Sequence, residues 1–245
     1  MKEMHIDDDG VCDAIVSHLS TSVVMLQTPK VFVLLAQPSF KGVELLNTVK
    51  SRLPNKNYST ALGSLSNFHA LADLNALPTA LHKKEKFEVF NGAIVRISVG
   101  SEKLNTSLVK NGTHQGLLIG GRHREVFCEI EEHFSMNSGN ILFGGKNFYA
   151  PFCTSANVSG DPSGPITNWD RAWGFGKERQ IPLVIRSSEI SGPMGSYPIF
   201  WIKRNSITLE REGLGQFQII DKLPVNLKPS SETVFCRKCV RSRAQ

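Results

Sequence analysis

Two short apolar runs restrict the fold of this chain more than any other feature. Residues 23–26 and 31–36 contain no polar side chain, and the break at residues 27–30 separates them. Strands without polar alternation are typical of sheets that are covered on both faces. Apolar residues at helical spacing flank the two runs, in residues 10–19 and 41–50. The sequence therefore predicts an α/β domain, a sheet with helices on its faces.

Residues 154–163, with the sequence TSANVSGDPS, are too polar and too small for a core strand. They follow an apolar lead-in at residues 150–153, so we expect a strand end that runs into a shaped loop. Ser, Thr and Asn side chains bond back to the nearby backbone, and Gly160 can adopt a positive φ at little cost. Outward-pointing amides beside such a glycine form a nest for phosphate or carboxylate. The alternative is an ordinary Ser/Asn/Gly turn.

A cluster of three cations follows the predicted helix over residues 41–50. Lys50, Arg52 and Lys56 fall within seven residues, and Pro54 ends the helix. A guanidinium and two ammonium groups in such a cluster can neutralise phosphate oxygens. The alternative is cationic capping of the helix C-terminus followed by a solvated turn.

The charge balance favours an anionic partner. The formal net charge is +6 and the sequence pI is about 9.1, which indicates association with a nucleotide, with RNA or with an acidic protein. The five cysteines are scattered and odd in number, as expected in a reducing compartment. Acidic residues at positions 7–9 argue against a targeting segment, and no apolar run approaches the ~20 residues of a membrane span. We expect a cytoplasmic protein without a membrane partner.

The order of residues in these stretches resembles that of a known family. The pattern T-S-A-N-x-S-G-x-P-S at residues 154–163 is similar to the hallmark loop of the YrdC-like threonylcarbamoyl-AMP synthase family. K-x-R at residues 50–52 and R-x-G at residues 211–213 resemble two further motifs of that family. The resemblance implies the family's α/β fold, a twisted mixed sheet with helices on its faces and a concave basic cleft.

The resemblance also implies which residues bind the ligands. It assigns the nucleotide to side chains with basic, hydroxyl or amide groups, namely Lys50, Arg52, Lys56, Thr154, Ser155, Asn157, Ser163 and Arg211, with Ser159 as a further candidate. It assigns the substrate to Thr28, His123 and Ser196. The family's reaction needs no nucleophile or general base from the protein, so we expect no catalytic side chain. We expect no metal site either, apart from Mg²⁺ shared among the phosphates of ATP.

Several positions depart from the family's pattern. Pro29 follows Thr28 where the family has Glu, and Ile119 stands where it has a strand arginine. Only Gly92 remains of a W-P-G-P turn, and Ser196 is the substitute for a Ser-Thr pair. The lost residues concentrate in the amino-acid pocket, whereas the nucleotide set is better kept.

Three functional hypotheses result. The first is ATP-dependent synthesis of threonylcarbamoyl-adenylate from L-threonine and bicarbonate or CO₂, for modification of transfer RNA. The second is a catalytically degenerate module that binds a nucleotide or double-stranded RNA. The third keeps carbamoyl-adenylate synthesis but uses another amine.

The chain divides into three predicted segments. Residues 1–20 form an N-terminal helix, residues 21–215 the YrdC-like nucleotide-binding domain, and residues 216–245 a basic, flexible tail. The tail contains C-x-x-C at residues 236–239. A zinc site needs four ligands and no second pair accompanies this one, so we predict no metal there.

Overall fold

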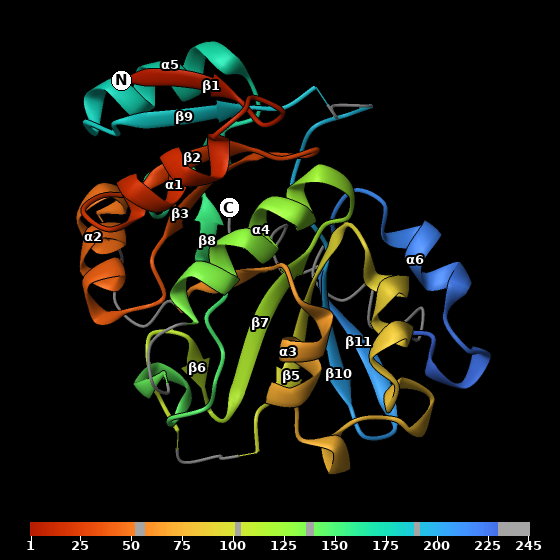
Figure 1. Cartoon of the computed structure of the whole chain (residues 1–245). Helices are drawn as coiled ribbons and strands as arrows, with labels where there is room; N and C mark the ends of the chain where they lie inside the picture. The colour runs from red at the N-terminus through yellow and green to blue at the C-terminus, as the bar shows by residue number, and fades with distance from the viewer. Residues whose placement is uncertain (52–56, 101–103, 136–139, 189–191, 230–245) are drawn as a thin grey trace.

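The computed structural model describes residues 1–51, 57–100, 104–135, 140–188 and 192–229, and its centre is one open, mixed sheet (Figure 1). The eleven strands lie in the order β1-β9-β2-β3-β8-β4-β7-β5-β10-β11, with β6 paired to β7. The strands are β1 (Lys2–His5), β2 (Val24–Gln27), β3 (Phe32–Ala36), β4 (Ser59–Leu62), β5 (Ala93–Ser98), β6 (Val109–Lys110), β7 (Thr113–Leu118), β8 (Phe152–Ser155), β9 (Leu183–Arg186), β10 (Ile199–Lys203) and β11 (Ser206–Arg211). Strand β2 runs parallel to β9 and antiparallel to β3.

Helices pack on both faces of this sheet. The α-helices are α1 (Val11–Leu19), α2 (Phe40–Lys50), α3 (Leu65–Leu71), α4 (Gly121–Phe134), α5 (Trp169–Glu178) and α6 (Gln216–Lys222). The 3₁₀ helices are η1 (Leu74–Ala76), η2 (Thr79–Leu81), η3 (Lys84–Phe90), η4 (Ile141–Phe143) and η5 (Val225–Leu227). Within the described ranges, none of the helices has the length and apolar character needed to cross a membrane.

Strand β2 separates the two hydrophobic cores. Val24 and Leu26 belong to the cluster that contains the apolar residues of α1 and α4, whereas Met25 belongs to the cluster that contains those of α2 and α5. Every residue of β2 and β3 is buried. A fully buried apolar side chain contributes roughly 1.5–3 kcal/mol, so these strands hold the layers together. The predicted α/β class, a mixed sheet with helices on its faces, is confirmed.

The half of the sheet that contains β5, β10 and β11 has one face less covered than the other. On β5, Ala93, Val95 and Ile97 are buried, whereas Ile94 and Arg96 are only half-buried. The same alternation runs along β10 and β11. Helix η3 contacts β5 and α6 on the buried side. The opposite face is therefore open to a ligand.

The first and last described segments both join the fold. Strand β1 pairs in parallel with β9 at the sheet edge; the sequence did not predict it, because four residues carry little periodicity. Residues 216–222, which the sequence placed in the tail, form α6, and Ile219 is buried because it packs into the core. The C-x-x-C at residues 236–239 lies outside the described residues, and the division into three segments stays a prediction.

A buried carboxylate fixes the start of α3 against α4. Glu131 Oε1 accepts a hydrogen bond from the Gly63 backbone N at 2.8 Å, and its Oε2 accepts one from Asn67 Nδ2 at 3.2 Å. Ser64, the N-cap of α3, also donates its backbone N–H to this carboxylate. Burial raises the pKa of Glu131 to about 7, although these donors oppose the shift.

We expect the replacement Glu131→Gln to remove one pH dependence of stability. Folding raises the pKa of this carboxyl from 4.5 to about 7, so between these values the folded chain binds more protons than the unfolded chain. The contribution of this carboxyl to the free energy of unfolding is therefore greatest below pH 4.5. This contribution falls by on the order of 3 kcal/mol as the pH rises from 4.5 through about 7. Urea unfolding of both proteins over this range measures the effect, and a constant difference between them would contradict it.

Candidate functional site

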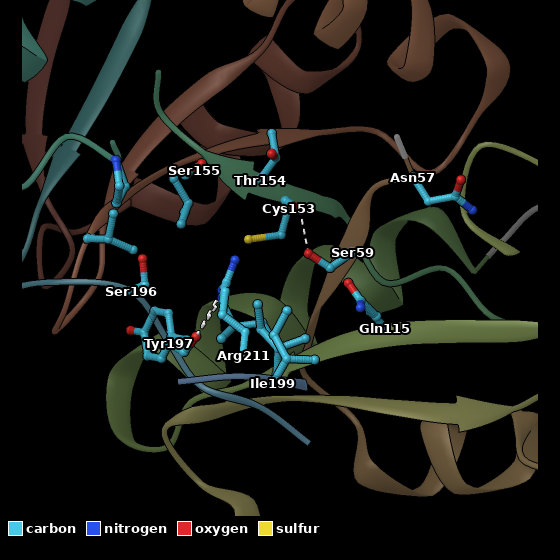
Figure 2. A pocket seen from close by; sticks show the side chains of 15 residues that line it. Asn57, Ser59, Gln115, Cys153, Thr154, Ser155, Ser196, Tyr197, Ile199 and Arg211 are labelled. Carbon is cyan, nitrogen blue, oxygen red and sulfur yellow. Dashed lines mark hydrogen bonds between the residues drawn. The ribbon is translucent and has the colours of Figure 1, made fainter. Parts of the chain in front are cut away.

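A cavity of about 280 Å³ lies against the open face of the sheet (Figure 2). Its lining comes from β3, β4, β5, β7, β8, β10 and β11 and from the loops next to them. Ile94 on β5 lies beside Leu117 on β7 and beside Ile199 on β10, and Ile199 lies beside Arg211 on β11. The sheet thus supplies an apolar surface to the cavity, and one guanidinium group lies at the edge of this surface.

Arg211 brings a positive charge into this cavity. Its Nε and Nη2 donate to the backbone O of Tyr197 at 3.2 and 2.9 Å, and the guanidinium points toward Cys153 (Figure 2). Burial lowers the pKa of Arg211, yet a guanidinium stays charged in proteins. No Asp or Glu of the described chain forms an ion pair with it. Arg211 as a whole is exposed at the end of β11, but its guanidinium lines the cavity without an acidic partner, and this position favours an anionic ligand.

Two residues with hydroxyl groups line the cavity from different walls. Thr154 comes from the end of β8 and Ser196 from the loop before β10. Neither hydroxyl bonds to another group within the described ranges. Ser155 also lines the cavity, but its Oγ donates to Asn157 Oδ1 at 2.6 Å. Of the predicted site residues, the structure brings Thr154, Ser155, Ser196 and Arg211 together here.

Lys50 lies beneath the loop at residues 154–163. Its side chain is almost fully buried, with 2% exposure. The Nζ donates to the backbone O of Ser155, to the backbone O of Asn157 at 2.8 Å and to Asn157 Oδ1 at 3.2 Å. The backbone O of Lys50 also accepts a hydrogen bond from the Ser159 N at 2.9 Å. Lys50 therefore anchors the loop, while its contact with a nucleotide stays a prediction.

Thr28 and His123 support the turn between β2 and β3. Thr28 is fully buried; its Oγ1 donates to the Val31 backbone O at 2.6 Å and accepts from Tyr197 Oη at 2.9 Å. His123 is also fully buried, with Nε2 at 2.9 Å from the backbone O of Gln27. Neither residue is among the described lining of the cavity. Their predicted contact with substrate stays a prediction.

The remaining predicted residues are Arg52, Lys56 and Ser163. Arg52 and Lys56 fall outside the described residues. Ser163 is exposed, and its backbone N donates to Asp161 Oδ1 at 2.8 Å, which shapes the end of the loop. Their predicted roles are not tested by this geometry.

Lys30 is a residue of the site region that the sequence did not single out. Its Nζ donates to the backbone O of Gly92 at 2.7 Å and to that of Leu214, and it lies 4.9 Å from the centroid of the Tyr197 ring. Burial lowers the pKa of Lys30 to about 8. The side chain joins three distant segments at the edge of the site, and a lone lysine in a turn gives no sequence signal for such a role.

The cavity offers binding groups and no activated nucleophile. Burial raises the pKa of the Cys153 thiol to about 12, so this lining residue stays protonated at neutral pH. The described residues contain no group of three or more His, Cys, Asp or Glu side chains that could hold a metal ion. The arrangement can bind and orient an anionic, hydrogen-bonding molecule.

We expect Lys50→Ala to lower the free energy of unfolding by roughly 2–4 kcal/mol, because the change leaves buried oxygens of the loop unpaired. Lys41→Ala is the matched control: Lys41 lies on the same helix, is exposed and donates to the backbone O of Ser20. It should change stability by less than about 0.5 kcal/mol. Urea unfolding compares the two variants. Equal stabilities would show that the ammonium does not hold the loop.

The sequence matches no family model and no curated protein, but solved structures share the fold. Sua5 of P. abyssi, complexed with L-threonine, is 14% identical with a TM-score of 0.60, and the match covers 93% of this chain and 65% of Sua5. E. coli YciO is 13% identical with a TM-score of 0.57, covering 87% of this chain and 95% of YciO. HypF in the phosphate- and nucleotide-bound form is 14% identical with a TM-score of 0.56, covering 82% of this chain and 28% of HypF.

The chain therefore spans about two thirds of the length of Sua5, with 65% of that chain covered. At identities of 13–14% the likeness concerns the fold and not the activity. The resemblance predicted from the loop at residues 154–163 is confirmed at this level: the chain has the fold of the Sua5 and YrdC-like proteins.

Proposed function

We propose that this protein synthesises threonylcarbamoyl-adenylate from L-threonine, bicarbonate or CO₂, and ATP, for the modification of transfer RNA. The observation that carries the proposal is the guanidinium of Arg211, which has no acidic partner in the described chain and shares a cavity with Thr154 and Ser155 of the loop. A neutral ligand would leave this charge unpaired. The likeness to a Sua5 structure that holds L-threonine adds support from the fold.

The reaction would need positioning more than acid–base chemistry. The amine nitrogen of threonine attacks CO₂ and loses a proton, which gives a carbamate. A carbamate oxygen then attacks the α-phosphorus of ATP, the bond from that phosphorus to the bridging oxygen breaks, and pyrophosphate leaves. Holding the reactants in line and neutralising charge supply most of the acceleration in such transfers. A cavity with binding groups and a protonated Cys153 suits this task.

The side chains of the cavity would have different roles in binding the reactants. Arg211 would neutralise an anionic group, and its planar fork suits phosphate or carboxylate oxygens. The hydroxyl group of Ser196 would orient the ligand through hydrogen bonds. Lys50 would keep the loop in place rather than carry the reaction. Mg²⁺ would enter with the phosphates of ATP as part of the substrate.

The identity of the amine is the least supported part of the proposal. Ile119, which replaces the family's strand arginine, is 4% exposed and packs in the apolar core. It therefore supplies no charge for a carboxylate. Carbamoyl-adenylate synthesis with another amine is an alternative that this substitution favours.

RNA binding without catalysis is the second candidate function, and a specific surface favours it. On the open face of the sheet, Lys203 Nζ lies 4.0 Å and Arg96 Cζ 5.8 Å from the centroid of the Trp201 ring. An aromatic ring beside cations can stack on bases and contact phosphates. Glu210, which pairs with Arg96 at 2.9 Å, weakens this argument because it offsets the charge.

We expect the purified protein to incorporate labelled bicarbonate into an adenylate in the presence of Mg-ATP and threonine, with release of pyrophosphate. Arg211→Gln should lower kcat/KM by about 10–100-fold, the loss of a charged hydrogen bond. Arg204→Gln, at an exposed cation in the turn between β10 and β11, is the control and should change it less than about twofold. Thermal melts check that Arg211→Gln folds.

The outcomes separate the candidates. If product forms with another amine and not with threonine, that amine is the substrate in place of threonine. RNA binding without product from any amine would favour the second candidate, an RNA-binding module without catalysis. Equal rates for the two arginine variants would show that Arg211 does not belong to the site.

A further inference from the structure

The cavity borders one of the two hydrophobic cores. Val31, Val33 and Leu117 line it, and all three belong to the core cluster that contains the apolar residues of α1 and α4. Ile94, which packs against the same cluster, and Ile199 of β10 complete this wall. The sheet register places Ile94 beside Leu117 and beside Ile199. A ligand in the cavity therefore meets aliphatic residues from four strands, β3, β5, β7 and β10.

The hydroxyl groups on the β4 and β8 side of the cavity are not free for a ligand. Ser59 Oγ donates to the backbone O of Cys153 at 2.8 Å (Figure 2). Ser155 Oγ donates to Asn157 Oδ1 at 2.6 Å. Thr154 lies between Cys153 and Ser155 on β8. Because successive side chains of a strand point to opposite faces, the Thr154 hydroxyl lies on the other side of the sheet.

The two side-chain amides of the lining also bond to the protein. Asn57 Nδ2 donates to the backbone O of Thr106 at 3.2 Å. Gln115 Oε1 accepts from Arg96 Nη2 at 2.6 Å in the amide orientation that satisfies both groups. Each amide therefore spends part of its hydrogen-bonding capacity on the protein itself.

One hydroxyl and one cation of the lining remain for a ligand. Ser196 Oγ has no partner within the described ranges, and Arg211 uses Nε and Nη2 on the backbone O of Tyr197 but not Nη1. No Asp or Glu belongs to the described lining, so a ligand's ammonium group would be left unpaired there. These groups suit a molecule with one anionic end, an uncharged nitrogen and an apolar body.

The volume of the cavity limits the size of that molecule. At about 280 Å³ it lies just below the ~300–1,000 Å³ of most small-molecule pockets, which suits an amino acid better than a whole nucleotide. We propose that the cavity binds an aliphatic α-amino acid such as valine, as its carbamate, with the carboxylate on Arg211 and the side chain against Val33 and Leu117. This assignment rests on the proposed function only for the reaction that follows binding, and it names the chemical class of the alternative amine.

Threonine is the sharpest comparison, because it has the shape of valine with a hydroxyl group in place of one methyl group. An apolar pocket distinguishes such isosteres by about 100-fold at most, whereas a site built to bond the hydroxyl rejects the analogue without it by about 10⁴–10⁵-fold. Ser196 precedes Tyr197 on the wall that carries Arg211, so its hydroxyl would meet the carboxylate end of the ligand. The direction of the preference therefore separates the two kinds of site.

Calorimetric titration of the full chain with N-acetyl-L-valine and with N-acetyl-L-threonine tests the proposal. The acetyl group removes the ammonium charge and imitates the planar carbamate. The wild type should bind the valine compound about 10–100-fold more tightly than the threonine compound. Arg211→Gln should weaken the binding of both compounds by about 10–100-fold and leave their ratio unchanged. Tighter binding of the threonine compound, or binding of neither, would overturn the proposal.

Two substitutions at Val33 test the apolar wall. Val33→Thr keeps the shape and adds a hydroxyl group, so the preference for the valine compound should fall about 2–10-fold, the value of one hydrogen bond. Val33→Ala makes room, so N-acetyl-L-isoleucine should gain about fourfold over the valine compound, the value of one buried methylene.

Val24 provides the matched controls for both substitutions. It is fully buried in the same core cluster but does not belong to the described lining of the cavity. Val24→Thr and Val24→Ala should therefore leave the affinity ratios within about twofold of the wild type. Unchanged ratios in the Val33 variants, or equal changes in the Val24 variants, would contradict the assignment.

Adenylate formation distinguishes this proposal from the proposed function. If the wild type makes adenylate with a higher kcat/KM for threonine than for valine, the reaction stands and the aliphatic assignment falls. If no amino acid gives adenylate while the valine compound binds with the expected preference, the assignment of the cavity stands and the synthase reaction falls.

Discussion

One buried ammonium group holds the loop on which the site depends. Removing Lys50 from water is costly, and its hydrogen bonds to oxygens of Ser155 and Asn157 offset that cost. Those oxygens can meet the ammonium only if the loop keeps one arrangement. Because Lys50 ends α2, whose Val43 and Leu46 lie in the core, the loop is tied to the packed interior.

Tyr197 plays the corresponding role on the opposite wall. Its hydroxyl donates to Thr28, its backbone O accepts from Arg211, and its ring lies beneath the ammonium of Lys30. Several polar groups near the cavity are therefore used by the protein itself. The groups left for a ligand are few, but the same contacts fix them in place, and such preorganisation favours tight and specific binding.

The sequence predicted the fold better than the roles of individual side chains. The apolar runs at residues 23–26 and 31–36 became β2 and β3, because burial on both faces leaves a strong signal. Strand β1 carried no such signal. A motif also does not say which way a side chain points, and Lys50, Thr28 and His123 all turned inward, where protein oxygens surround them. Gln115 could have been found at the cavity from its spacing of two from Leu117 on the same strand.

The residue at position 119 shows how this fold can persist without a particular ligand contact. Ile119 packs in a core cluster with Val31 and Tyr197. Replacing a buried charge by a well-packed apolar residue is often neutral or stabilising. A ligand contact can therefore be lost at such a position without a lower free energy of unfolding. Fold likeness at 14% identity therefore says little about the amine. Arg211 is the opposite case, because its guanidinium lines the cavity without an acidic partner in the described chain, and an anionic ligand is the physical reason to keep it there.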